Sequence, residues 1–168
     1  MHLNDHIMNE NKPIIEVLND LMQINNDRIE GYQKAIDNIG QNNVMLKTLF
    51  YQIAEESHSC KRELSEKLVE LGGEPADAKT TVAGKVYRVW MDIKATFSGH
   101  DTKSTLNACE FGEDAAQKAY KEALKLSENY PDEIRDMIRS QKNLLRMSHD
   151  LVRNMRDQYR EVEETSNA

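Results

Sequence analysis

Residues Leu46–Gly73 read LKTLFYQIAEESHSCKRELSEKLVELGG and carry the pattern that decides the fold. Apolar and small side chains recur there every three or four positions, at Leu46, Phe50, Ile53, Ser57, Cys60, Leu64, Leu68 and Leu71. This spacing follows the 3.6-residue turn of an α-helix and gives the helix one apolar face. The pattern stops at Gly72, because a glycine tolerates the left-handed backbone that ends many helices. We therefore predict an amphipathic helix over residues 43–71.

Three other segments show the same one-sided spacing, and none shows the sustained alternation of a strand. The predicted helices cover residues 14–39, 102–128 and 132–160. The three prolines stand at the edges of these segments: Pro13 precedes the first, Pro75 follows the second and Pro131 opens the last. Asp101 or Thr102 is placed to cap the third helix. The sequence thus predicts an all-α protein of four helices.

The connection between the second and third helices is too long for a plain loop in a compact bundle. Within it, Val82 to Phe97 form another short amphipathic stripe, and we predict a crossover helix over about 82–97, anchored by a packed Trp90. A long connection at this point is typical of ferritin-like topology. We predict one ferritin-like four-helix-bundle domain over residues 1–168, a length that suits a single core.

Composition excludes several classes of protein. The chain has 22 basic and 29 acidic residues, and a net charge of -7 argues against binding nucleic acid. No apolar run is long enough to span a membrane, and the first residues lack the apolar stretch of a signal peptide. The two cysteines, Cys60 and Cys109, form no disulfide framework. We therefore expect a cytoplasmic protein that has no contact with membranes.

Several short stretches resemble a known family. They are Asn25–Tyr32, Leu71–Pro75, Val86–Trp90 and Cys109–Asp114. Together they resemble a bacterial family of ferritin-like four-helix-bundle proteins of unknown function, over roughly Ile14 to Arg156. The resemblance implies a ferritin-like bundle in a bacterial cytoplasm, and it implies no established activity.

A ferritin-like bundle raises the question of a di-iron centre. Such a centre needs a Glu from each of two helices and a Glu-x-x-His from each of the other two. The chain contains one such motif, Glu55 to His58, but at 100° per residue it points largely away from the apolar face. Glu30 on the first helix also points outward. We therefore predict that the chain lacks a di-iron centre.

The polar residues predicted to face inward form a different set. They are Asn25, Arg28, Ser57, Glu113, Gln141 and Ser148. Glu113 lies at the centre of an apolar stripe, so its carboxylate must be paired, hydrogen-bonded or protonated. Arg28 is the expected partner, and Asn25, Gln141 and Tyr120 are expected to complete the hydrogen bonds of the carboxylate. We interpret the set as a structural polar layer with no catalytic residue.

Two functions from different classes remain open. The first is a non-enzymatic structural or interaction protein without a cofactor, which acts by association with itself or with another protein. The alternative is a metal-binding or ferroxidase-type protein that holds iron or another divalent ion with Glu56, Glu110, Glu113 and His149, if rotation of the helices brings these side chains together. Metal content of the purified protein separates the two.

Overall fold

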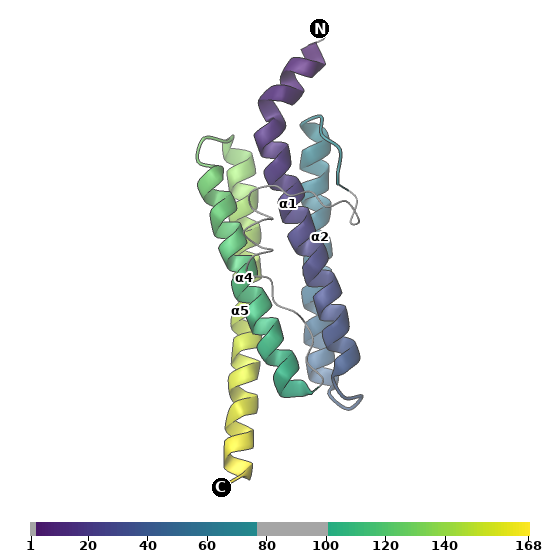
Figure 1. Cartoon of the computed structure of the whole chain (residues 1–168), viewed down its shortest axis with the longest axis vertical. Coiled ribbons are helices and arrows are strands. Elements are labelled where there is room, and N and C mark those ends of the chain that lie inside the picture. Colours follow the sequence, from purple (N-terminus) through teal and green to yellow (C-terminus); the bar gives the residue numbers. More distant parts are fainter. Residues whose placement is uncertain (1–2, 77–100) are drawn as a thin grey trace.

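The computed structural model describes residues 3–76 and 101–168, and within these ranges the regular structure is entirely helical. The described residues form four helices: α1 (Leu3–Asn38), α2 (Val44–Glu70), α4 (Thr102–Leu126) and α5 (Asp132–Ser166). They form the predicted four-helix bundle (Figure 1). The predicted crossover helix over 82–97 and its anchor Trp90 lie outside the described residues.

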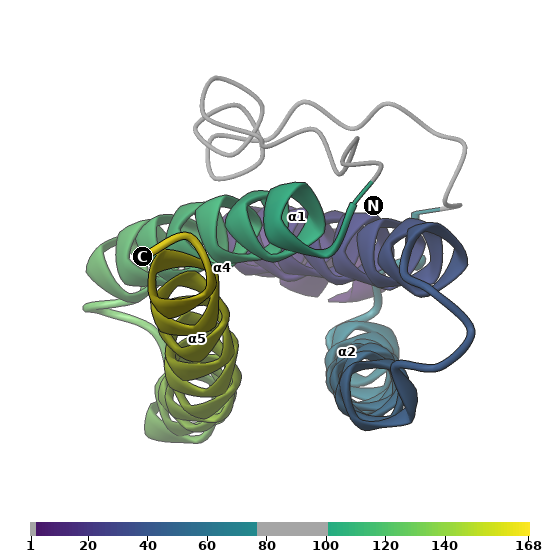
Figure 2. The ribbon, with the colours of Figure 1, turned by 90° about the horizontal axis from the view of Figure 1, so that it is seen from below.

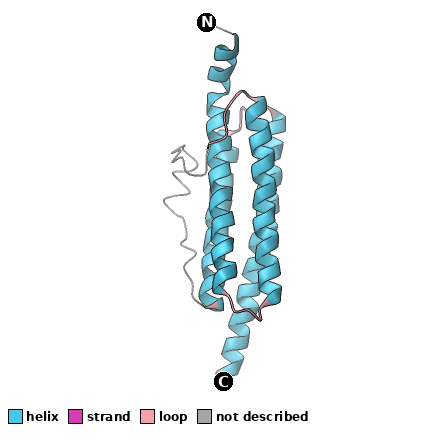
Figure 3. Ribbon diagram, turned by 90° about the vertical axis from the view of Figure 1, so that its right-hand side faces the viewer, coloured by secondary structure: helices cyan, strands magenta, loops and turns pink. Residues whose placement is uncertain are grey.

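The helices form two antiparallel pairs, α1 with α2 and α4 with α5, which pack on each other mainly through α1 and α4 (Figure 2). Helix α2 ends at one end of the bundle, and α4 begins at the opposite end (Figure 1). As a result α2 and α4 run in the same direction, which is the topology that the long second connection predicted. Figure 3 shows that the helices lie side by side along the long axis of the bundle over most of their length.

Both outer boundaries of the bundle differ from the predictions. Helix α1 begins at Leu3 rather than near residue 14, so Pro13 lies inside it, and α5 continues to Ser166 rather than ending near 160. Proline removes one intrahelical hydrogen bond but does not always end a helix. The turn before Pro13 is also tied down, because Asn11 Nδ2 donates to the carbonyl of Leu71 at 3.3 Å. The prediction that Pro13 precedes the first helix is therefore wrong.

The inner helix ends follow the expected chemistry. The Asp101 carboxylate accepts from the backbone N–H of Ser104 at 2.8 Å and caps α4. Gly72 has a φ of 84° directly after the end of α2. Gly73 is also required, since a Cβ there would lie 2.9 Å from Cγ2 of Ile15. This close approach joins the end of α2 to α1.

Among the residues that the structure describes, the apolar core consists of two clusters, one toward each end of the bundle. On α1 the first cluster extends to Ile24 and the second begins at Tyr32, so that Arg28 lies between them. The same division recurs on the other helices, where Ser57, Glu113 and Ser148 fall between members of the two clusters. A polar layer therefore crosses the middle of the bundle.

Candidate functional site

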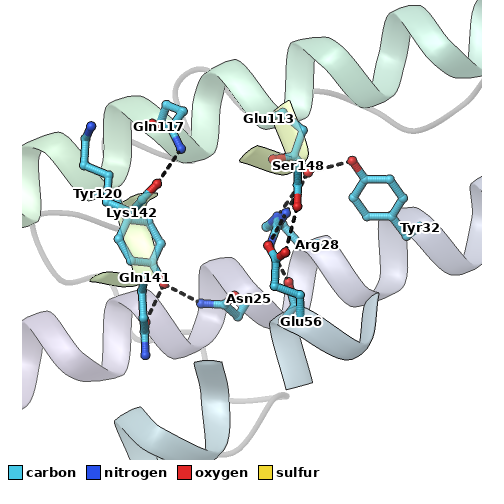
Figure 4. A network of polar contacts seen from close by, with 11 residues as sticks. Asn25, Arg28, Tyr32, Glu56, Glu113, Gln117, Tyr120, Gln141, Lys142 and Ser148 are labelled. Carbon is cyan, nitrogen blue, oxygen red and sulfur yellow. Dashed lines mark hydrogen bonds and ion pairs between the residues drawn. The ribbon is translucent and has the colours of Figure 1, made fainter. Parts of the chain in front are cut away.

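The side chain of Arg28 lies at the centre of this layer and is 1% exposed. Its Nη2 donates to Oε1 of Glu113 at 2.8 Å, and its Nε approaches the same oxygen at 3.3 Å. Its Nη1 donates to Oγ of Ser57 at 2.6 Å. Figure 4 shows Arg28 between the carboxylates of Glu113 and Glu56. The ion pair that the sequence predicted between Arg28 and Glu113 is therefore present, deep in the bundle.

The Glu113 carboxylate has a second donor that the sequence analysis missed. The hydroxyl of Tyr32 donates to Oε1 of Glu113 at 2.6 Å, while Oε2 is buried without a hydrogen-bond partner. Helical spacing places Tyr32 on the apolar face of the first predicted helix, and a buried tyrosine usually needs a hydrogen-bond partner for its hydroxyl, which was the available signal. The expectation that Asn25, Tyr120 and Gln141 complete the hydrogen bonds of Glu113 is wrong.

Glu56 closes the layer from α2. Its Oε1 lies 3.4 Å from both Nη1 and Nη2 of Arg28, and its Oε2 accepts from Oγ of Ser148 at 2.7 Å. With Ser148 on α5 and Glu113 on α4, all four helices contribute to one connected network around the guanidinium. The layer thus joins the two helix pairs through charge-assisted hydrogen bonds.

The remaining predicted residues form a separate network one turn away. Asn25 Nδ2 and the hydroxyl of Tyr120 are 2.8 Å apart, and that hydroxyl donates to Oε1 of Gln141 at 2.8 Å. Gln141 in turn donates to the carbonyl of Cys60 at 3.2 Å. The six predicted polar residues are all buried, but they divide into a charged group and a neutral group.

Burial and charge act against each other in this layer. Burial alone lowers the pKa of Arg28, but the negative charges around it, Glu113 foremost, raise that pKa above its ordinary value. Burial raises the pKa of Glu56 despite the nearby guanidinium, and burial also raises the pKa of the Tyr32 hydroxyl. Burial raises the pKa of the Cys60 thiol to about 12. Arg28 therefore stays charged near neutral pH, whereas the Tyr32 hydroxyl and the Cys60 thiol stay protonated and neutral, so these three groups do not suit proton transfer there.

The four alternative metal ligands do not come together. Glu56 and Glu113 belong to the layer around Arg28, whereas Glu110 and His149 lie at the rim between α4 and α5. There they meet Asp114, which the sequence analysis did not select. The sequence could have indicated Asp114, because it follows Glu110 by four residues and residues four apart lie on the same face of a helix.

Comparison with solved structures defines the class of the fold, which is ferritin-like. The Bacteroides fragilis bacterioferritin-related protein, a dodecameric thioferritin, gives a TM-score of 0.75 at 15% identity and covers 95% of both chains. Dps from Mycobacterium smegmatis gives 0.72 at 17% identity, over 92% of this chain and 90% of that one. A ferritin-like diiron-carboxylate protein from Bacillus anthracis gives 0.63 at 18% identity, over 93% and 99%.

Residues 13–126 match a protein family described as a domain of unknown function (DUF2383). This protein belongs to that family, in agreement with the resemblance seen in the sequence. Among curated proteins none matches the chain. Of the helices that the structure describes, none combines the length and the apolar character needed to cross a bilayer.

Proposed function

We propose that this chain is a self-associating ferritin-like protein in which an internal guanidinium–carboxylate layer takes the place of a di-iron centre. The observation that carries the proposal is the position of Arg28, between carboxylates from two other helices. In this reading the protein acts by association, with no redox cofactor in its interior.

The residues around Arg28 do not fit a pair of iron ions. Two dications need several carboxylates to offset their charge, whereas one guanidinium already neutralises one of the two carboxylates, Glu56 and Glu113. The guanidinium of Arg28 also lies within hydrogen-bond distance of the Glu113 carboxylate, in the space that a metal ion bound by this carboxylate would need. In the part of the chain that the structure describes, the hydrogen bonds of this layer involve no histidine.

The open side between α2 and α5 supports association. A groove of about 500 Å³ runs between these helices, lined by Met45, Thr48, Leu49, Gln52, Leu151, Asn154, Met155 and Gln158. Beside it, Leu144, Met147 and Leu151 form an exposed stripe on α5 at helical spacing. The dodecameric state named for the bacterioferritin-related neighbour favours homo-oligomers as the form of association.

The test combines metal analysis with solution mass. Protein produced in iron-supplied cells should lack a stoichiometric pair of iron ions and should not oxidise ferrous iron rapidly. Its mass by light scattering should exceed one chain, and Met147→Glu or Leu151→Glu should reduce it. Val69→Glu serves as a matched control, because Val69 is a similarly exposed apolar residue that belongs neither to the groove nor to the exposed stripe on α5.

Two results would overturn the proposal. The first is a pair of iron ions per chain that disappears in Glu113→Gln, because that outcome would place metal in the layer. The second is a monomeric mass at all concentrations tested, since association is the activity proposed.

A further inference from the structure

A cluster of potential metal ligands lies outside the buried layer, at the rim where α4 packs on α5. Glu110 and Asp114 are one turn apart on α4, and His149 comes from α5. One ligand atom from each lies within 4.8 Å of the others. The side chain of His149 is 13% exposed and that of Asp114 55% exposed, so the cluster is anchored in the bundle and open to solvent on one side.

The histidine is oriented as it would be in a metal site. Its Nε2 lies 2.7 Å from Oδ1 of Asp114, and its Nδ1 lies 3.1 Å from Oδ1 of Asp150. Histidines that bind metal nearly always donate their other ring N–H to a carboxylate or carbonyl, which fixes the ring and the tautomer. Asp150 occupies that outer position, and it leaves Nε2 directed at the two carboxylates of α4.

The charges at the rim favour a cation. Glu110, Asp114 and Asp150 bring three carboxylates to the imidazole, while Arg156 forms an ion pair with Glu110. Arg156 also pairs with Asp157 at 2.7 Å, so its guanidinium has another partner when Glu110 binds elsewhere. One arginine therefore offsets only part of the negative charge around His149.

We propose that Glu110, Asp114 and His149 bind a single first-row divalent transition-metal ion, with Asp150 orienting the imidazole. An imidazole with two carboxylates suits Zn²⁺, Fe²⁺ or Mn²⁺-like ions, and the nitrogen ligand disfavours Mg²⁺ and Ca²⁺. Three protein ligands leave coordination positions for water. The site is separate from the Arg28 layer, although neighbouring residues of α4 and α5 belong to the two. Glu113 and Ser148 point inward to the layer, whereas the next residues, Asp114 and His149, point to the rim.

The experiment is calorimetric titration of ZnCl₂ into the full-length, tag-free and chelator-treated protein. We expect one Zn²⁺ per chain, with little competition from excess Mg²⁺. His149→Ala and Asp114→Asn should each weaken binding by more than about 10-fold, and Asp150→Asn by about 10–100-fold, as is usual for an outer partner of a ligating histidine. Arg156→Gln should tighten binding, because it frees Glu110.

Matched controls separate this site from other imidazoles and from the interior. His6→Ala and His58→Ala change histidines outside the cluster and should leave Zn²⁺ affinity unchanged. Glu113→Gln should also leave it unchanged, so that the outcome is independent of the proposed function. Absence of Zn²⁺ binding by the wild type, or equal affinity in folded His149→Ala, would overturn the proposal. Folding of each variant is checked by circular dichroism.

Discussion

Replacing Arg28 with alanine tests the buried layer most directly, because it removes the partner of two carboxylates at once. Glu113 is 1% exposed and Glu56 15% exposed, so neither stranded charge can recover full hydration. Removing one member of a buried pair typically costs about 3–5 kcal/mol. In a chain of this length each kcal/mol lowers the melting temperature by roughly 2–4 °C, so we expect a decrease of about 6–20 °C.

The pairing itself is tested by a double-mutant cycle with Glu113→Gln. The second change removes a stranded charge, and the amide oxygen of glutamine can still accept from the Tyr32 hydroxyl. The double variant should therefore be more stable than Arg28→Ala alone, with a coupling free energy of about 1–3 kcal/mol. Urea unfolding followed by circular dichroism measures all four proteins.

The control for this cycle is Arg139→Ala, which removes an exposed arginine that pairs with Asp136. Surface pairs of this kind contribute about 0–1 kcal/mol, so the variant should melt close to the wild type. Additive effects of Arg28→Ala and Glu113→Gln would refute the reasoning. So would an Arg28→Ala variant as stable as Arg139→Ala.

The other predictions concern single groups. Tyr32→Phe should cost about 1–3 kcal/mol in urea unfolding, because it removes a hydroxyl donor from a buried carboxylate. Because the pKa of Glu56 is raised above its ordinary 4.5, the folded chain holds this proton more tightly than the unfolded chain does. Stability should therefore fall as pH rises above 4.5, and Glu56→Gln should flatten that decline in urea titrations on both sides of this pH. The Cys60 thiol, with a pKa of about 12, should react with a thiol reagent only as fast as the protein unfolds, as followed by absorbance. Asp101→Ala should cost about 1 kcal/mol in the same unfolding assay, through loss of the α4 cap.

Periodicity was sufficient to predict four helices and their inner ends, because those ends carry residues with a specific backbone or capping role. Asp101 caps α4 and Gly72 adopts a positive φ, as such residues do in many proteins. The outer ends were harder to predict. The turn before Pro13 is held by the hydrogen bond from Asn11 to the carbonyl of Leu71, a residue 60 positions later in the sequence. Helical periodicity does not report contacts between residues so far apart.

The polar layer shows the same limit at the level of single atoms. Helical spacing identified Arg28 and Glu113 as inward-facing, since direction around a helix depends only on residue number. It could not establish which donor completes the carboxylate, because that depends on the height at which side chains of different helices meet. Tyr32, rather than Tyr120, is at the height of Glu113. Asp114 was missed for a related reason: its role arises only where α4 meets His149.

The position of the charged layer between two apolar clusters has a consequence for how the helices align lengthwise. Leucine and isoleucine stripes alone would tolerate sliding of α1 by one turn, about 5.4 Å, because each side chain would meet another of similar shape. Such a shift would carry Arg28 away from Glu113, Glu56 and Ser57, either to the neutral network of Tyr120 and Gln141 or into the apolar cluster that begins at Tyr32. An ion left unpaired in that setting costs several kcal/mol. The layer thereby fixes the register of the helices, because an arrangement in which α1 is shifted by one turn is higher in free energy than the native one.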